Sequence, residues 1–371
     1  MTDTSNDWFH ITNVQDIDSP ALVVYPARIK ENIRLVVERV ADIQLLRPHV
    51  KTHKMAAVAQ LQLQAGITKF KCATIAEAEM LGIEKAPDVL LAYQPVGPKV
   101  QRFIQLIKMY PDTLFSCLVD NEVTANSINH QCIEAGITLN VFLDLNVGMN
   151  RTGILPQNAF GLFQYCHALS NINPIGFHGY DGNINDTDIN IRQQRSDIAY
   201  DNIQALVKRI LDQLHILPVI LSGGSPSFAT HLLRKGVEVS PGTFIFWDYG
   251  YKTMLPAEPY SYAALVISRV ISIIDAHTIC TDLGHKAVAA ENPLPRVHFL
   301  NAPQAIPIGQ SEEHLILQVR DSTKYAPGDV LYGVPIHICP TVALYDKAVV
   351  IENNTATGEW AVTARGRKIT V

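Results

Sequence analysis

The sequence of 371 residues has no long uninterrupted apolar run, and no segment approaches the ~20 apolar residues that span a membrane. Its first residues, MTDTSNDWFHITN, lack the basic and apolar regions of a secretory signal. Lysine and arginine number 30 against 35 aspartates and glutamates, and this net charge of −5 provides no basic surface for nucleic acid. These absences predict a cytoplasmic protein that binds neither membranes nor nucleic acid.

Cysteine is scarce, and its six positions form neither a CxxC pair nor the spacing of a disulfide framework. Five of the cysteines lie in apolar segments and are predicted to be small core residues. These are Cys72, Cys117, Cys132, Cys166 and Cys280. Cys339 differs because it stands two residues after a histidine.

Short apolar segments alternate with amphipathic segments between residues 20 and 260. Counted from the segment around Lys51, eight of them fit strands, the others being residues 69–74, 88–93, 114–120, 139–147, 174–181, 218–222 and 237–240. Eight strands with helical crossovers predict an α/β TIM (β/α)8 barrel, with a doubly wound open sheet as the alternative. Beyond residue 260, strand-like segments separated by turns predict a smaller C-terminal β-domain. Two domains agree with the chain length.

The stretch Arg47–Lys54, RPHVKTHK, places charged residues where a predicted strand over Ile43–Leu46 ends, before a predicted helix over residues 55–63. At this edge of a barrel, Lys51 is a candidate Schiff-base lysine, made nucleophilic by burial and by cationic neighbours. The neighbours are Arg47, His49, His53 and Lys54. A solvated lysine beside a helix start is the alternative interpretation.

Two loops of small residues follow the seventh and eighth predicted strands: Ser222–Ser225 (SGGS) and Pro241–Thr243 (PGT). Small residues let backbone N–H groups approach an anion, and TIM barrels often bind phosphate on these loops. Together with an activated lysine they favour a phosphate-bearing cofactor, although each loop alone is typical of an ordinary turn.

Arg151 and Tyr180 follow the fifth and sixth predicted strands, in DLNVGMNRTG and HGYD. The guanidinium of Arg151 could hold a phenolate or a carboxylate at the barrel mouth, or it could lie on the surface. Tyr180 could donate to the same ring system or to substrate, or it could fill the barrel interior.

His337 and Cys339 stand two apart in PIHICPTVALYD. On a strand they would share a face, so an imidazole and a thiolate could bind one cation; core packing is the alternative. Two protein ligands leave room for water or substrate, which suits a catalytic metal. Zinc suits a nitrogen and sulfur pair, while manganese and magnesium remain open.

Eight motifs in this order resemble the D-threonine aldolase and D-serine dehydratase family, the alanine-racemase-like branch (fold type III) of pyridoxal-phosphate enzymes. They are RPHVKTHK, CATIAEAEML, DLNVGMNRTG, GFHGYDG, SGGSPS, EVSPGTF, SEEH and PIHICPTVALYD. The resemblance runs from about Pro20 to Arg367. It implies a pyridoxal-phosphate-binding barrel over residues 20–260. Residues 261–371, joined by residues 1–19, would form a C-terminal β-domain that carries a metal site.

Residue by residue, the resemblance implies that Lys51 forms the Schiff base with pyridoxal 5'-phosphate, with Arg151 near its phenolic oxygen and Tyr180 beside the ring or substrate. Four small residues would hold the phosphate: Gly223, Gly224, Ser225 and Thr243. His337 and Cys339 would bind a divalent cation. Members are commonly homodimers with shared active sites.

With the cofactor as an electron sink and a metal on the β-hydroxyl, a D-3-hydroxy amino acid can lose water to give a 2-oxo acid and ammonia, or split into glycine and an aldehyde. The resemblance implies His-x-Cys in dehydratase-like members and more often His-x-Asp in aldolases. His337-x-Cys339 therefore favours a dehydratase acting on D-serine, D-threonine or D-3-hydroxyaspartate. Asn150 and Ile336 depart from the family pattern, where Gly and Asn are frequent. An aldolase, an amino-acid racemase and a non-catalytic cofactor-binding protein are the alternatives.

Overall fold

The computed structural model describes residues 8–371, and these fall into two compact units. The barrel unit consists of Val36–Lys51, Ala59–Gly242 and Gly366–Val371. The sheet unit consists of the described residues up to Leu35, with Thr52–Val58 and Thr243–Arg365. Among residues 8–371, no helix is both long and apolar enough to cross a membrane.

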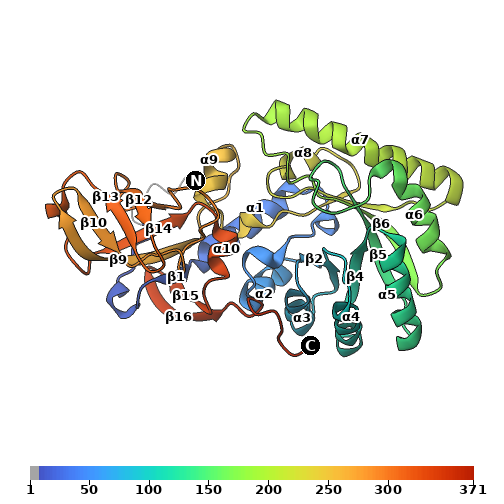
Figure 1. Ribbon diagram of the computed structural model, residues 1–371, viewed down its shortest axis with the longest axis horizontal. Coiled ribbons are helices and arrows are strands. Elements are labelled where there is room, and N and C mark those ends of the chain that lie inside the picture. Colours follow the sequence, from blue (N-terminus) through green and yellow to red (C-terminus); the bar gives the residue numbers. More distant parts are fainter. Residues whose placement is uncertain (1–7) are drawn as a thin grey trace. The chain divides into compact units, whose positions relative to one another are not determined.

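The barrel unit is built on a parallel sheet of seven strands in the order β2-β3-β4-β5-β6-β7-β8. The strands are β2 (Lys69–Cys72), β3 (Asp88–Leu91), β4 (Leu114–Val119), β5 (Leu139–Leu145), β6 (Ile172–Gly179), β7 (Val219–Ser222) and β8 (Val237–Val239). The helices between them are α3 (Ile75–Ile83), α4 (Pro98–Met109), α5 (Glu122–Ala135), α6 (Pro156–Ala168), α7 (Ile189–Leu214) and α8 (Phe228–His231). Helices α3 to α7 flank the strands (Figure 1). The predicted alternation of strand and helix is confirmed.

The segment Leu46–His49 closes the barrel. Leu46 forms a parallel bridge with Val239 of β8, and His49 forms one with Lys71 of β2. The N–H of Lys71 donates to the carbonyl of Pro48 at 2.9 Å. The segment therefore occupies the eighth strand position, and the predicted barrel class is confirmed.

The prediction of a buried strand over Ile43–Leu46 is wrong, because Ile43–Leu45 is a 3-10 helix that begins after Asp42. The carboxylate of Asp42 accepts the N–H of Gln44 at 2.9 Å, which stabilises this turn. Farther along, Pro48 has no N–H to donate, so the closing segment cannot form a continuous ladder. A second 3-10 helix, Val50–Thr52, follows it.

The barrel interior contains one apolar layer and a set of buried charges. Leu90, Leu118, Phe142 and Leu221, from β3, β4, β5 and β7, form the apolar layer. Burying each such side chain contributes about 1.5–3 kcal/mol. The charged side chains lie elsewhere in the interior and are described with the site.

The sheet unit contains a nine-stranded sheet with the central order β12-β13-β10-β9-β1-β15-β16, in which β14 pairs with β9 and β11. The strands are β1 (Ala21–Val24), β9 (Ala264–Asp275), β10 (Thr278–Thr281), β11 (Val297–Phe299), β12 (Ile306–Gln310), β13 (Leu315–Gln318), β14 (Val330–Pro335), β15 (Lys347–Glu352) and β16 (Thr355–Ala361). Strand β1, from the N-terminal part of the chain, pairs with β9 and β15.

The other helices of the described chain are α1 (Pro26–Arg39), α2 (Ala56–Gln64), α9 (Tyr249–Met254) and α10 (Ile338–Val342). Short 3-10 helices cover Val14–Asp16, Thr243–Ile245 and Ser322–Lys324.

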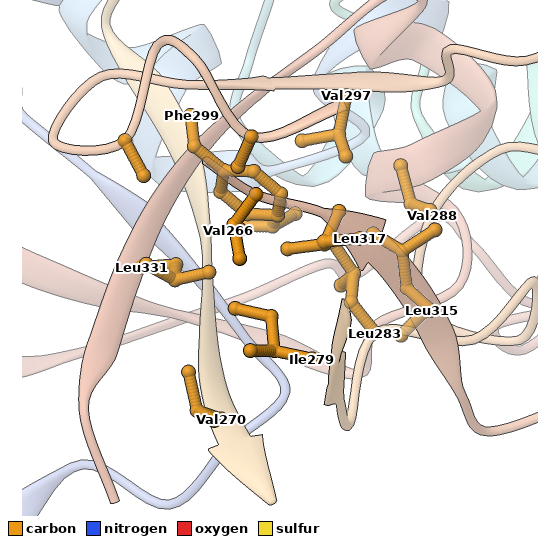
Figure 2. Packing of buried hydrophobic residues seen from close by; sticks show 14 residues of the cluster. Val266, Val270, Ile279, Leu283, Val288, Val297, Phe299, Leu315, Leu317 and Leu331 are labelled. Atoms are coloured by element: carbon orange, nitrogen blue, oxygen red, sulfur yellow. The ribbon is translucent and has the colours of Figure 1, made fainter. Parts of the chain in front are cut away.

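A buried apolar cluster holds part of the sheet unit together (Figure 2). Val266 and Val270 of β9 pack with Ile279 of β10 in this cluster. Leu315 and Leu317 of β13 are both fully buried, while Gln318 is exposed. Because strand residues two apart share a face, this alternation turns one face of β13 toward the cluster.

Candidate active site

Lys51 lies at the edge of the barrel unit, in the 3-10 turn that follows the closing segment. Its backbone N–H donates to Nδ1 of His49 at 3.3 Å. The N–H of His49 donates to the carbonyl of Pro241 at 2.9 Å, in the loop after β8. The half-buried Lys51 side chain therefore starts where parallel strands end, which is the edge at which barrel enzymes carry their active sites.

Arg47 is a structural cation rather than an uncompensated neighbour of Lys51. Its guanidinium donates to Asp88 at 2.6 and 2.9 Å and to Glu238 at 2.7 Å, and its side chain is 2% exposed. Glu238 also pairs with Lys69 at 2.5 Å. Buried charges are costly unless they are paired and hydrogen-bonded. The two cations and two carboxylates of this cluster pair with one another and so meet that requirement. The expected contribution of Arg47 to a cationic neighbourhood is offset by two carboxylates.

Lys71 is a second cation in the barrel interior, and sequence reasoning missed it. Its Nζ lies 3.5 Å from Nε2 of His178. Nδ1 of His178 is 2.7 Å from a carboxylate oxygen of Asp144, which also accepts the hydroxyl of Thr152 at 2.7 Å. Lys71, His178 and Asp144 come from β2, β6 and β5 and are buried. Two lysines at alternating positions of a short strand, in KFKC, were the signal that could have revealed it.

The charges of this cluster follow from burial and pairing. Burial, and next the charge of Lys51, lower the pKa of Lys71 to about 7. Burial also lowers the pKa of His178. Burial opposes ionisation of Asp144, but the hydrogen bonds from His178 and Thr152 outweigh it and lower the pKa of that carboxyl. At neutral pH the imidazole is therefore neutral, donates from Nδ1 to Asp144 and accepts at Nε2 from Lys71.

The structure brings Tyr180 and Arg151 together at the ends of β6 and β5. Cζ of Arg151 lies 5.0 Å from the centre of the Tyr180 ring, and Nζ of Lys71 lies 5.7 Å from it. A Cβ atom at position 224 would lie 2.8 Å from Cε2 of Tyr180. The absence of a side chain at Gly224 therefore allows the ring to pack against the backbone of the loop after β7.

The two predicted phosphate loops of the barrel unit are joined, since Oγ of Ser225 accepts the N–H of Gly242 at 3.3 Å. Within the first loop, the N–H of Gly223 donates to the carbonyl of Gly179 at 3.2 Å. The N–H of Gly224 donates to the hydroxyl of a serine three residues on, at 3.3 Å. These two N–H groups hold the shape of the loop.

That serine, Ser227, belongs to a buried network behind the loop. Its hydroxyl donates to Asp181 at 2.5 Å, and the same carboxylate lies 2.8 Å from Nε2 of His231. Burial opposes ionisation of Asp181, but hydrogen bonds from His231 and Ser227 outweigh it and lower the pKa of its carboxyl. Because Ser227 donates to the aspartate and not to the histidine, these three residues support the loop and do not form a nucleophilic triad.

Ser222, at the end of β7, supplies a polar atom that suits a bound molecule. Its side chain is 1% exposed, and its hydroxyl oxygen has no hydrogen-bond partner among residues 8–371. A buried hydroxyl left unpaired costs about 1–3 kcal/mol. This hydroxyl lies at the same end of the parallel strands as the amine of Lys51 and the guanidinium of Arg151. A hydrogen-bond donor and two cations at one strand edge fit an anionic cofactor such as pyridoxal phosphate.

In the sheet unit, the prediction that His337 and Cys339 share a strand face is wrong. Strand β14 ends at Pro335, and His337 is the N-cap of α10, with φ −135° and ψ 104°. The side chain of His337 still interacts with that of Cys339, and this interaction raises the pKa of the imidazole. Asp248 holds the helix start by accepting the N–H of Ile338 at 3.1 Å.

The surroundings of this pair are polar. Nδ1 of His337 lies 2.5 Å from Glu291, and Sγ of Cys339 lies 3.2 Å from Oγ1 of Thr52 and 3.7 Å from Oγ1 of Thr243. Thr243, which was predicted to hold phosphate, is thus a neighbour of Cys339 in the sheet unit. Burial opposes protonation of His337, but Cys339 and the carboxylate of Glu291 outweigh it and raise its pKa to about 9.

The donors of this pair fit a divalent cation with open coordination positions. The described part of the chain contains no group of three His, Cys, Asp or Glu side chains that could hold a metal ion. A cation would therefore have His337 and Cys339 as its protein ligands, a nitrogen and a sulfur of the kind that zinc prefers. Binding would displace the proton of His337.

Comparisons with known proteins agree with this fold and these motifs. Residues 24–250 match the family model "Alanine racemase, N-terminal domain", and residues 263–351 match "Putative serine dehydratase domain". The chain belongs to the alanine-racemase-like family, fold type III, of pyridoxal-phosphate-dependent enzymes. The resemblance found in the motifs is confirmed.

The relatives are lyases. The chain is 26% identical to D-threonine aldolase of Arthrobacter sp. over 362 residues, which are 94% of this chain and 93% of that protein. It is 24% identical to D-threo-3-hydroxyaspartate dehydratase of Delftia sp. over 380 residues, 93% of this chain and 97% of that protein. The crystal structure of D-threonine aldolase from Filomicrobium marinum superposes with a TM-score of 0.88 at 24% identity, covering 95% of this chain and 97% of that one.

Solved variants of a D-threo-3-hydroxyaspartate dehydratase have the same fold, with a TM-score of 0.83 at 21% identity for one that covers 93% of this chain and 97% of its own. That variant replaces a cysteine with alanine and is in a metal-free form. Another replaces a histidine two residues before that cysteine.

Proposed function

We propose that this chain is a pyridoxal-phosphate- and metal-dependent lyase that removes water from a D-3-hydroxy amino acid, as a D-serine or D-threonine dehydratase does. The observation that carries the proposal is the contact between His337 and Cys339 at the start of α10. The metal-free cysteine variant of the related dehydratase, with its histidine two residues earlier, supports it.

In this proposal the barrel unit holds the cofactor. Lys51 provides the amine to which the cofactor attaches, and Arg151 provides a guanidinium for the phenolic oxygen, with Tyr180 beside the ring or substrate. The loops after β7 and β8 hold the phosphate, with Ser222 as a donor that now lacks a partner among the described residues. When bound, pyridoxal phosphate supplies an electron sink for charge that develops at Cα.

The chain's own residues then move the protons. The amine of Lys51 takes the proton from Cα, so that a C–H bond breaks while an N–H bond forms at Nζ. His337 and Cys339 would hold a divalent cation, which would supply Lewis acidity to the β-hydroxyl. Loss of the β-hydroxyl gives an enamine that water converts to a 2-oxo acid and ammonia.

Retro-aldol cleavage to glycine and an aldehyde is the second candidate. The match to D-threonine aldolase, at 26% identity over 94% of the chain, favours it. Here the β-hydroxyl loses its proton and the Cα–Cβ bond breaks. The same residues would therefore assist the cleavage of a carbon–carbon bond instead of the loss of the hydroxyl group. A racemase or a non-catalytic cofactor-binding protein would have no use for the His337 and Cys339 pair.

D-threonine distinguishes these reactions because its two fates share no product. Purified protein loaded with cofactor is incubated with D-threonine, with and without a chelator, and the products are identified by mass. We expect 2-oxobutanoate and ammonia, lost on chelation and restored by zinc, with L-threonine as the stereochemical control. Glycine and acetaldehyde would establish the aldolase, and conversion to L-threonine a racemase.

The proposal also includes zinc as the ion, a homodimer with shared active sites, and a cytoplasmic location. Metal analysis of protein purified without added metal tests the first. Sedimentation equilibrium tests the second, and fractionation of the native cell tests the third.

A further inference from the structure

Glu291 has no part in the function proposed above, although its carboxylate contacts one of the two candidate metal ligands. An oxygen of this carboxylate lies 2.5 Å from Nδ1 of His337. An ionised carboxylate only accepts hydrogen bonds, so the hydrogen in this contact belongs to Nδ1. Both the imidazolium and the neutral Nδ1–H tautomer of His337 provide that hydrogen.

The loop that carries Glu291 is bonded to the segment of His337 on both of its sides. Before Glu291, the N–H of Ala289 donates to Oγ1 of Thr341 at 3.1 Å. The hydroxyl of Thr341, which is fully buried, donates in turn to the carbonyl of His337 at 2.8 Å. After Glu291, strand β11 pairs with β14, the strand that leads into His337. The carboxylate therefore reaches the imidazole from a loop of the sheet unit that is held at both ends.

An ordinary surface ion pair is the competing interpretation of this contact. The side chains of His337 and Glu291 are 39% and 45% exposed, and exposed pairs contribute little to stability. The imidazole, however, also interacts with the side chain of Cys339. Stability alone therefore gives no reason for a carboxylate held against a histidine that has a thiol as its second neighbour.

Metal-binding histidines supply such a reason. A histidine that ligates a metal through one ring nitrogen almost always donates its other N–H to a carboxylate, a carbonyl or water, which fixes the tautomer and the orientation of the ring. Because Nδ1 of His337 donates to Glu291, the nitrogen left for a cation is Nε2. Among residues 8–371, no three His, Cys, Asp or Glu side chains form a metal-binding group, so Glu291 does not act as a third ligand beside His337 and Cys339.

We propose that Glu291 is a positioning residue of the metal site: its carboxylate accepts the N–H of Nδ1, holds His337 in one tautomer and one orientation, and so directs Nε2 to a divalent cation. Glu291 acts through His337 and does not touch the cation. The inference rests on the proposed function for the presence of a metal at His337 and Cys339.

The affinity for zinc tests this role without any measurement of turnover. The full-length protein, loaded with pyridoxal phosphate and freed of metal, is titrated with zinc in competition with a chelator of known affinity. Glu291→Ala should raise the dissociation constant of zinc about 10–100-fold. Glu291→Gln keeps a neutral acceptor at the same length, so its dissociation constant should lie between those of the alanine variant and the wild type.

The matched control is Glu359→Ala. Glu359 is another half-exposed glutamate of the sheet unit, 49% exposed, and it pairs with Lys347 at 2.7 Å instead of with a candidate ligand. This variant should bind zinc as the wild type does. Melting temperatures of all variants show whether a loss of zinc affinity comes from a loss of folding, and if Glu291→Ala melts early, Glu291→Gln decides the test.

Nitrogen NMR of the imidazole identifies the ligating atom directly. The signals of His337 are those missing from the spectrum of His337→Gln. When zinc binds to the wild type, Nδ1 should keep its hydrogen, and the Nε2 signal should move to that of a metal-bound nitrogen. A purely structural ion pair between Glu291 and His337 would not determine which nitrogen binds zinc.

The outcomes separate this inference from the proposed function. Unchanged zinc affinity in folded Glu291→Ala, or zinc bound at Nδ1, would overturn the inference and leave a metal-dependent lyase standing. Equal losses in the alanine and glutamine variants would also overturn it, because a hydrogen-bond acceptor would then not be what holds the imidazole. A wild-type protein that binds no zinc would overturn both, whereas glycine and acetaldehyde from D-threonine would change the reaction but not the role of Glu291.

Discussion

Replacing Arg47 with methionine tests whether the buried charges of the barrel are structural. The change removes two hydrogen bonds to Asp88 and one to Glu238, at 2.6 to 2.9 Å. Glu238, 4% exposed, keeps its contact with Lys69, but Asp88, 21% exposed, loses its guanidinium partner. Removing one member of a buried pair costs about 3–5 kcal/mol, because the other is left uncompensated.

The expected loss is large enough to measure by heat or urea. A change of 1 kcal/mol shifts the melting temperature by about 2–4 °C in chains of 150–250 residues. Arg47→Met should therefore lower the melting temperature of the barrel unit by roughly 6–20 °C. The matched control is Arg34→Met, which breaks the exposed pair with Glu31, whose side chains are 51% and 48% exposed. An exposed pair contributes about 0–1 kcal/mol, so the control should shift melting by only a few degrees.

A compensating change sharpens this test. Adding Asp88→Asn to Arg47→Met removes the charge left without its partner, and part of the lost stability should return. The exposed control should keep a free energy of unfolding within about 1 kcal/mol of the wild type. If Arg47→Met does the same, the inference that these buried charges depend on one another is refuted.

Lys51→Ala should abolish covalent retention of the cofactor after borohydride reduction, together with all turnover; a retained, active cofactor would contradict the assignment. Cys339→Ala should lose the bound metal and the elimination of water while keeping the cofactor, as followed by metal analysis and absorption spectra. Unchanged elimination of water in this variant would contradict the metal role. Gly153→Ala should weaken cofactor binding through the loop of Arg151, because its Cβ would lie 2.6 Å from the backbone N of residue 146. Gly161→Ala, whose Cβ meets nothing within 4 Å, should bind normally and gain up to about 1 kcal/mol.

The sequence alone determined the alternation of strands and helices in the barrel and the positions of its functional loops. Helices α3 and α5 fall in the segments between predicted strands, after residues 69–74 and 114–120. Predicted strands such as residues 114–120 differ from the observed ones by a residue or two. These features depend on local periodicity, which neighbouring residues encode by themselves. The motifs around Lys51, Arg151 and Cys339 were also readable, because each lies within a short stretch of chain.

Only the tertiary structure decided which side chains meet across strands. Lys71, His178 and Asp144 come from three strands, and their contact depends on register and barrel closure, which no local pattern states. Arg47 looked like a free cation until its two carboxylate partners, 41 and 191 residues away, were placed beside it. His337 and Cys339 do meet, but at a helix start rather than on a strand. In each of these cases the contacts of a side chain are made with partners or elements whose positions depend on the fold. The residue type alone could therefore not determine those contacts.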